Sequence, residues 1–326
     1  MSAADLAGWS NAAVYAAMVV LTFSMIAFAA TFSARGNRVS TDARKTPVTV
    51  GVGADSAPSV RVDPAASGQS TTAPPIDERG RRAGNVGLSL AWLGFGLLLL
   101  GAVLRGVWAG RVPWGNMYEY SLSSAVAILG VYLFMSLRRD LRWLGVFATG
   151  ATLLTVGLAV TVLYTEAAQL VPALTSWWLV IHVSAAIISG GAFTIAAGLT
   201  GLYLWRERAE RRGRVSGAVA RLPQAVKLDT MAYRILAFAF PLWTFAVIAG
   251  AIWAENAWGR YWGWDPKETW AFITWVIYAG YLHARATAGW RGRRAAYIAI
   301  LGWVSFLINY FGVNLFVNSL HSYAGV

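Results

Sequence analysis

The stretch V-G-L-S-L-A-W-L-G-F-G-L-L-L-L-G-A-V-L, residues 86–104, decides the fold class of this chain. It contains no charged residue and exceeds the roughly 18 apolar residues that indicate a transmembrane helix, because about 20 residues are needed to cross the hydrocarbon core. Similar runs recur along the 326 residues, of which 57% are hydrophobic. The sequence therefore predicts an all-α integral membrane protein whose core is a helix bundle in lipid.

Working outward from that stretch, the apolar runs predict about eight transmembrane helices. We expect them near residues 11–32, 86–108, 119–137, 143–163, 175–205, 231–254, 268–288 and 295–318. Boundaries read from a sequence are accurate to about four residues. The first run is expected to stay in the mature protein, because Arg35 and Arg38 follow it, whereas a cleavable signal carries its positive charge in front.

The basic residues sort into alternate connections between these runs. One set of connections holds 23 of the 27 lysines and arginines, and the other holds only Arg105, Arg111, Arg260 and Lys267. Because cytoplasmic loops are enriched in Lys and Arg, this pattern predicts a multi-pass protein of a bacterial plasma membrane with both termini on the outer side. Topology then accounts for the formal net charge of +12, and we expect no nucleic-acid partner.

Residues 33–85 form the one long polar insert. They are rich in Ser, Thr, Pro, Gly and Ala and cannot bury enough apolar area to fold alone, so we predict a disordered cytoplasmic linker. The chain then divides into a first transmembrane helix at 1–32, this linker, and a membrane domain at 86–326. The absence of cysteine excludes disulfides, thiolate metal sites and a cysteine nucleophile.

Histidine occurs three times, at His182, His283 and His321. Ionisable groups inside membrane helices are costly and are functional candidates by default. His182 is expected about 8 Å below the outer surface, and His321 follows the last helix on the same side. His283 is expected roughly 22 Å deeper, too far to share a metal ion with the other two. The alternative for His182 and His283 is a hydrogen bond to a neighbouring helix, and the alternative for His321 is an incidental position near the C-terminus.

The outer segment at 255–270 reads E-N-A-W-G-R-Y-W-G-W-D-P-K-E-T-W. An aromatic belt at the membrane interface explains scattered tryptophans such as Trp243. It does not explain a cluster of tryptophans set around acidic residues and a proline. Asp265, followed by Pro266 and Glu268, predicts the N-cap of a helix.

Flat aromatic faces beside hydrogen-bonding groups suit a planar macrocycle with carboxylate edges, and haem is such a molecule. Lys267 or Arg260 could meet its propionates, and two histidines could ligate the iron from opposite faces. We expect Asp265 and Glu268 to shape the loop or meet propionates, and we assign no catalytic residue. The cofactor-binding residues expected at this loop are His182, His321, Trp258, Trp262, Trp264, Asp265 and Trp270, with His182 and His321 as metal ligands. His283 joins them as a metal ligand only through the resemblance described next.

Trp258-Gly259 followed by W-G-W-D-P-K-E-T-W at 262–270 resembles the WWD signature of haem-handling proteins. The resemblance is greatest to the CcsA/ResC-type subunit of the system II cytochrome c synthase, often labelled CcsB in actinobacteria, and it covers roughly residues 86–326. The segment P-W-G-N-M-Y-E at 113–119 also resembles a family segment, with lower specificity. The insert at 33–85 has no counterpart in the family core.

The resemblance implies two haem b sites. At the outer site, the two family histidines that flank the WWD loop correspond by position to His182 and His321. At the inner site, the family histidine within the membrane corresponds to His283, and its second axial ligand comes from a ResB/Ccs-type partner subunit. The implied reaction attaches haem vinyl groups to the two thiols of a C-x-x-C-H motif in apocytochrome c, with an extracytoplasmic thiol-reducing protein as a further partner.

Three functions stay open at this point. The first is a haem lyase subunit that acts with a partner and moves haem to the outer face. The second is a haem exporter or delivery protein without lyase activity, as in CcmC-type relatives of the WWD loop. The third is a channel or assembly factor that binds no haem, which predicts a colourless preparation.

Overall fold

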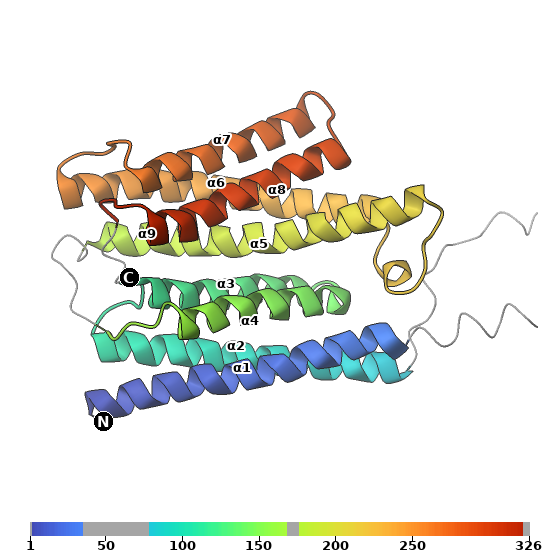
Figure 1. Ribbon diagram of the computed structural model, residues 1–326, viewed down its shortest axis with the longest axis horizontal. Helices are drawn as coiled ribbons and strands as arrows, with labels where there is room; N and C mark the ends of the chain where they lie inside the picture. The colour runs from blue at the N-terminus through green and yellow to red at the C-terminus, as the bar shows by residue number, and fades with distance from the viewer. Residues whose placement is uncertain (1, 35–77, 168–175, 322–326) are drawn as a thin grey trace, which may run out of the picture.

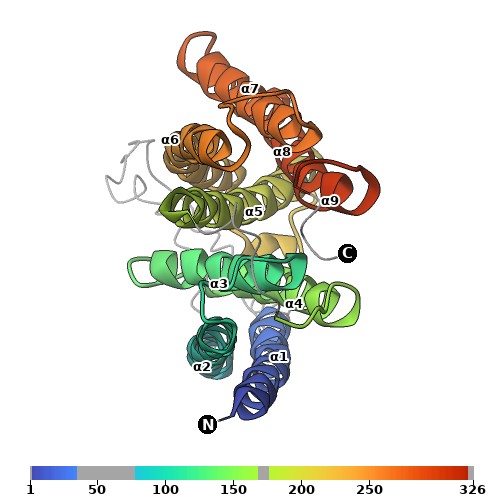
Figure 2. The same cartoon turned by 90° about the vertical axis from the view of Figure 1, so that its left-hand side faces the viewer.

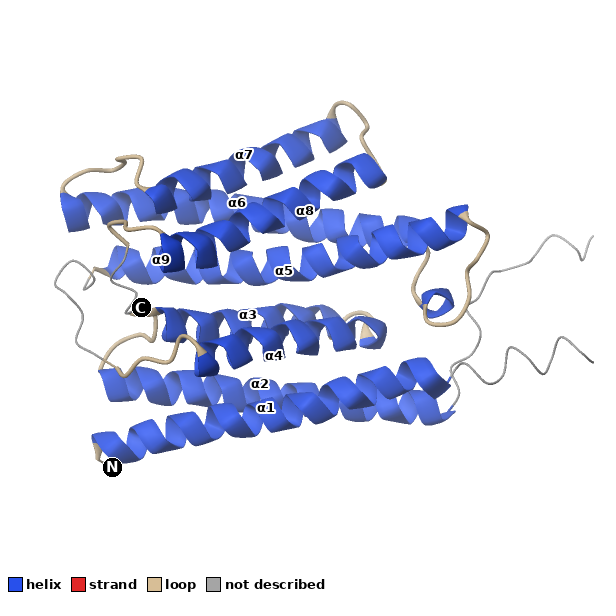
Figure 3. Cartoon of the chain, in the orientation of Figure 1, coloured by secondary structure: helices blue, strands red, loops and turns tan. Residues whose placement is uncertain are grey.

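The computed structural model describes residues 2–34, 78–167 and 176–321, and every regular element within these ranges is helical (Figure 3). The all-α prediction is therefore confirmed. The long helices are α1 (Ala3–Ala34), α2 (Glu78–Ala109), α3 (Met117–Ser136), α4 (Gly145–Thr161), α5 (Trp177–Arg211), α6 (Ala225–Trp258), α7 (Pro266–Ala286) and α8 (Arg293–Leu307). The shorter elements are η3 (Arg142–Leu144), η5 (Val219–Arg221), the π-helical turn η6 (Ile308–Gly312) and α9 (Val313–Phe316).

The helices lie lengthwise and successive ones run in opposite directions (Figure 1). The α3–α4, α5–α6 and α7–α8 connections lie at one end of the bundle, which we call the basic end because it carries residues such as Arg139, Arg212 and Arg291. The α2–α3 and α6–α7 connections lie at the opposite end, which we call the site end. This sorting agrees with the predicted alternation of loops, and the side of the membrane that each end faces stays a prediction.

Seven helical stretches of the described chain are long and apolar enough to cross a membrane. They comprise α1 to α6, with η3 continuous with α4, and the run from α8 through α9. α7 corresponds to the helix predicted at 268–288 and is 21 residues long, but it is not among the seven. Its ionisable residues, among them Lys267, Glu268, His283 and Arg285, lower its mean hydropathy.

Four helices, α1, α2, α5 and α6, extend beyond their predicted bounds by more than four residues, and the extensions of α2 and α6 change an earlier assignment. α2 begins at Glu78, so residues 78–85, which the sequence placed in the linker, are helical. Arg142 explains the difference, because its guanidinium donates to Asn85 Oδ1 over 2.7 Å and anchors the start of α2. Residues 35–77 of the predicted linker lie outside the described residues. α6 runs to Trp258, which is therefore the last residue of a helix and not a loop residue.

The seam between α1 and α2 explains how these helices pack so closely. Gly87 faces Phe28 and Gly94 faces Leu21, where a Cβ on Gly94 would lie 2.5 Å from Leu21 Cδ2. Such close approach of backbones at small residues is the main way that membrane helices associate. Ser24 Oγ also donates to the carbonyl of Gly87 over 2.7 Å.

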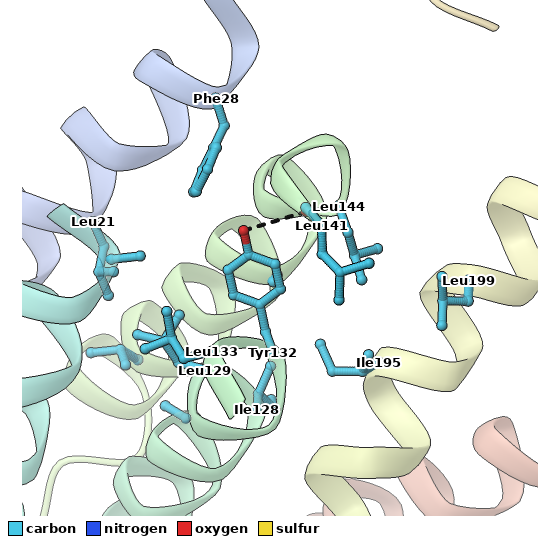
Figure 4. Close-up of a cluster of buried hydrophobic side chains, with 14 of the residues drawn as sticks. Leu21, Phe28, Ile128, Leu129, Tyr132, Leu133, Leu141, Leu144, Ile195 and Leu199 are labelled. Carbon is cyan, nitrogen blue, oxygen red and sulfur yellow. Dashed lines mark hydrogen bonds between the residues drawn. The ribbon is translucent and has the colours of Figure 1, made fainter. Parts of the chain in front are cut away.

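A buried cluster around Tyr132 joins this pair to the rest of the bundle (Figure 4). Tyr132 of α3 makes an edge-to-face contact with Phe28 at 6.1 Å, and its hydroxyl donates to the carbonyl of Leu141. Ile195 of α5 lies in the same cluster. α3 and α4 are thus the layer between the α1–α2 pair and α5, as the end view shows (Figure 2).

A second aromatic cluster fixes α5, α6, α7 and α8 against one another. Phe193 of α5 is its centre, with ring centroids 4.3 Å from Tyr278, 5.8 Å from Trp243 and 5.9 Å from Phe306. All four side chains are buried. This cluster fixes the relative positions of the four helices below the site end.

Candidate functional site

The connection between α6 and α7 is held by a single capping network. Asp265 accepts from the backbone N–H of Lys267, and Glu268 Oε2 accepts from the backbone N–H groups of Asp265 and Gly263 over 3.0 and 2.8 Å. Pro266 stands at the first helical position, which suits a residue without an N–H. The predicted helix start at Asp265 is confirmed, and Glu268 has the structural role that the sequence indicated.

Asp265 also binds the C-terminal segment. Its Oδ1 accepts from the backbone N–H of Leu320 and its Oδ2 contacts His321 Nδ1, both at 2.9 Å. Burial raises the pKa of Asp265, but the hydrogen bonds from His321 and Leu320 outweigh it and hold that pKa below its usual value. Burial lowers the pKa of His321, so its ring is neutral at pH 7. Because the carboxylate can only accept, Nδ1 carries the proton and the lone pair lies on Nε2.

His182 is oriented in a similar way from the other side of the site. Its Nδ1 lies 2.7 Å from the carbonyl oxygen of Ala246, one turn before Gly250 on α6. A carbonyl accepts, so Nδ1 donates and the lone pair again lies on Nε2. α6 approaches so closely that a Cβ on Gly250 would lie 2.7 Å from the imidazole. Metal-ligating histidines typically donate their other ring N–H to a carboxylate or backbone carbonyl, and both histidines here do so.

Trp253 of α6 lies between the two imidazoles. Its ring is parallel to His182 within 5° at 6.3 Å and tilted against His321 at 5.9 Å. Trp258 lies 4.9 Å from His321 and makes an edge-to-face contact with Trp253 at 4.8 Å. Trp253 is only 1% exposed, so the centre of the site is an aromatic wall between two oriented histidines.

These side chains surround one cavity at the site end, which we call the histidine cavity. Both His182 and His321 line it, together with Trp258, Trp262 and the side chain of Lys267. Its other walls come from 114–117, α5, α6 and η6. This lining offers two imidazoles, the amine of Lys267, the carboxylate of Glu268 and several indole faces. Burial lowers the pKa of Lys267 to about 7, so its amine is only partly protonated at neutral pH.

The donor set fits haem, whereas the space for it is limited. Two imidazoles are a common axial pair for haem iron, and indole faces suit a porphyrin plane. The volume of the histidine cavity is about 140 Å³. That is less than the roughly 300–1,000 Å³ of typical ligand pockets. A macrocycle between the histidines therefore requires the ring of Trp253 or Trp258 to move.

The other predicted residues lie apart from this cavity. Trp264 and Trp270 do not line it, and Trp264 is 66% exposed with a positive φ of 59°, a strained backbone conformation for a tryptophan. Arg260 pairs with Glu268 at 3.4 Å, which leaves Lys267 as the basic residue that faces the cavity. His283 is exposed near the far end of α7, away from this cavity.

A buried ion cluster positions the segment 114–117. Glu119 is fully buried and accepts from Arg105 Nε at 3.1 Å, from Arg111 Nη1 at 2.6 Å and from the backbone N–H of Gly115 at 2.8 Å. Asn116 caps α3 by accepting from the backbone N–H of Glu119. Arg105 and Arg111, two of the four basic residues outside the basic loops, therefore help to hold Trp114 against the histidine cavity.

Sequence reasoning missed part of the cavity wall. Trp253 was not singled out, although its spacing of five residues from Trp258 places both near the end of α6. Trp243, interpreted as an interfacial belt residue, is 4% exposed and lines the cavity. Asn309 in the π-helical turn also lines it, and π-helical turns are frequent at functional sites.

Fold and site together define a multi-pass membrane protein with a tryptophan-walled histidine cavity at one end. The chain belongs to the family described as cytochrome C assembly protein, whose model matches residues 114–321. The resemblance based on the WWD motif is thus confirmed.

Individual relatives agree with this family. The chain is 37% identical over 257 residues to the cytochrome c biogenesis protein CcsA of Guillardia theta, a match that spans 71% of this chain and 85% of that protein. It is 36% identical over 253 residues to CcsA of Prochlorococcus marinus, spanning 70% of this chain and 80% of that protein.

A solved structure shares the fold. The cytochrome c heme lyase CcmF superposes with a TM-score of 0.61 at 14% identity, over 94% of this chain and 46% of CcmF. This chain therefore corresponds to slightly under half the length of CcmF. The likeness concerns the arrangement of helices, since the identity is low.

Proposed function

We propose that this protein binds haem in the histidine cavity and positions it for covalent attachment to apocytochrome c. The single observation that carries the proposal is that His182 and His321 line one cavity and each has its Nδ1 held by an acceptor. Two fixed tautomers of this kind leave both Nε2 atoms as ligands for iron. The family membership supports the haem chemistry.

The residues of this chain would act mainly by position. Holding two reactants in a productive geometry can supply much of a rate enhancement without acid–base chemistry. Haem supplies the vinyl groups, and the apocytochrome supplies the two thiols of its C-x-x-C-H motif, since this chain contains no cysteine. Lys267 would meet a propionate, because Arg260 is paired with Glu268. Burial lowers the pKa of Lys267 to about 7, and a propionate beside it would favour the protonated, cationic form.

The topology and partners belong to the same proposal. The site end faces the outside of a bacterial plasma membrane, and the basic end faces the cytoplasm. His283, exposed on α7, would hold haem at an inner site with a histidine of a ResB/Ccs-type subunit. Residues 86–326 are then the haem-handling domain.

Coexpression of this chain with a ResB-type subunit and a reporter apocytochrome c tests the proposal. We expect covalently bound haem on the reporter, scored by haem staining of a denaturing gel, and its loss in the His182→Ala and His321→Ala variants. Trp290→Ala, at an exposed position in the α7–α8 connection, is the control and should leave staining unchanged. Haem that copurifies with this chain while the reporter stays unstained would favour the delivery function instead.

A further inference from the structure

A second cavity opens on the side of the bundle, between α2 and α3 on one wall and α5 and α6 on the other. We call it the lateral groove, and its volume is about 890 Å³. Apolar side chains form most of its lining, including Leu99, Val103, Phe134, Ile188 and Phe238, each of which is exposed. Within the described part of the chain, no histidine or tyrosine lines it. An apolar surface that faces outward at membrane depth has to be covered by lipid tails or by protein.

Three arginines line the same groove. Arg138 and Arg139 follow the end of α3 at the basic end, and Arg234 lies on α6 on the opposite wall. Among the described residues no ion pair or side-chain hydrogen bond involves these guanidinium groups. The nearest acids in sequence have other partners, since Asp140 pairs with Arg142 at 2.6 Å and Asp229 pairs with Arg285 at 2.7 Å. The groove thus combines an apolar body with a concentrated positive charge.

We propose that the lateral groove binds an anionic phospholipid, with its phosphate on Arg138, Arg139 and Arg234 and its acyl chains along α3 and α5. Arginine forks match phosphate oxygens in geometry and charge, and basic pockets between membrane helices bind anionic headgroups. Haem also combines an apolar body with negative charge. The groove offers its iron no imidazole or phenolate but only the thioethers of Met135 and Met231, which ligate haem iron in cytochromes c alongside a histidine. The lining therefore favours the lipid.

The lipid would join the two halves of the bundle. The groove lies between α2 and α3 on one side and α5 and α6 on the other, beside the direct packing of α3 on α5. Trp114 lines both the groove and the histidine cavity. Acyl chains in the groove would therefore press on the far side of one wall of the histidine cavity. The site itself depends on the groove and the arginines alone, and it stands whether or not haem binds above it.

Native mass spectrometry of the full chain in nanodiscs tests the proposal. The discs contain phosphatidylglycerol and phosphatidylcholine in equal amounts, and the variant Arg138→Gln/Arg139→Gln/Arg234→Gln is compared with the unaltered chain. Each arginine near a membrane surface attracts an anionic headgroup enough that losing three weakens phosphatidylglycerol retention by roughly 100-fold. The matched control is Arg212→Gln/Arg214→Gln/Arg291→Gln, three exposed arginines at the basic end that do not line the groove, and it should retain the lipid.

A second variant tests acyl-chain binding separately from headgroup binding. Ile188→Trp fills the apolar part of the groove without touching the arginines, and we expect it to lower phosphatidylglycerol retention at least 10-fold with its helical circular dichroism unchanged. Equal retention of phosphatidylglycerol by the unaltered chain and both groove variants would overturn the proposal. Loss of haem without loss of lipid from the arginine variant would also overturn it, and would assign the groove to haem.

Discussion

The histidine cavity and the lateral groove lie side by side and differ in almost every physical property. The histidine cavity is small, aromatic and polar, and its two imidazoles are held by defined acceptors. The lateral groove is about 890 Å³, lined by aliphatic and phenylalanine side chains, and carries its charge on long, exposed arginines. The comparison indicates that the histidine cavity fixes the orientation of its ligating side chains. The lateral groove instead offers a large apolar volume and positive charge.

Trp114 is the boundary between them, since it lines both. Its position depends on the buried cluster of Arg105, Arg111 and Glu119, two of which are fully inaccessible to solvent. Substitutions can therefore test this difference at three places: at the boundary between the two cavities, inside the histidine cavity, and at the rim of the histidine cavity. The predictions below follow that order.

Glu119→Gln should have the largest effect. It leaves two guanidinium groups near 0% and 13% side-chain exposure without their carboxylate, and breaking such a buried pair costs roughly 3–5 kcal/mol of stability. The measurement is unfolding in mixed micelles with increasing dodecyl sulfate. Glu78→Gln is the control, because its pair with Arg82 is exposed and should contribute no more than about 1 kcal/mol. Similar midpoints for the two variants would show that the cluster does not hold this wall.

Gly250→Ala should disturb the histidine cavity from within α6. The added Cβ would lie 2.7 Å from the His182 ring, and such overpacking typically costs about 1–3 kcal/mol. The ring must then turn away from the Ala246 carbonyl, so we also expect weaker haem binding, measured by titration followed at the Soret band. Gly280→Ala on α7 is the control, since a Cβ there meets nothing within 4 Å. Unchanged haem affinity in Gly250→Ala would show that the His182 orientation is irrelevant.

Asp265→Asn should separate helix capping from histidine orientation. Asparagine is as good an N-cap as aspartate, so α7 should keep its start. The amide cannot reproduce both acceptor contacts to Leu320 N–H and His321 Nδ1, and losing such a partner typically lowers metal affinity by about 10–100-fold. The readout is the haem dissociation rate to excess apomyoglobin. A rate within twofold of the unaltered protein would contradict the role given to Asp265.

Trp264→Ala should have the smallest effect on haem binding. The side chain is 66% exposed and does not line the histidine cavity, and substitutions at such surface positions usually change stability by less than about 0.5 kcal/mol. Trp258→Ala is the informative companion, because that ring packs 4.9 Å from His321 and lines the cavity. Equal loss of haem in the two variants would contradict this difference, because it would mean that Trp264 contributes as much to haem binding as Trp258.

Much of this arrangement could be predicted from the sequence, for identifiable reasons. Apolar runs longer than a bilayer crossing predicted the helices, and the charge bias of the loops predicted which connections lie together. Asp265-Pro266 followed by Glu268 predicted the start of α7, because capping chemistry is local.

Properties that depend on tertiary contacts could not be predicted in this way. Residues 78–85 are polar and were assigned to a linker, yet Arg142 draws them into α2. Trp243 has the composition of a belt residue, and only helix packing shows that it is buried beside the cavity. Trp264 and Trp270 belong to the signature but do not line the cavity. Trp253 and Trp258, near the end of α6, line it instead.

The central claim is that His182 and His321 ligate haem in the histidine cavity. Electron paramagnetic resonance of the oxidised protein, purified from haem-replete cells, tests it most directly in a His283→Ala background that removes the proposed inner site. The account predicts a low-spin bis-imidazole signal there, which becomes high-spin or disappears in His182→Ala and in His321→Ala and returns on addition of imidazole. A bis-imidazole signal that persists unchanged in both variants would contradict it.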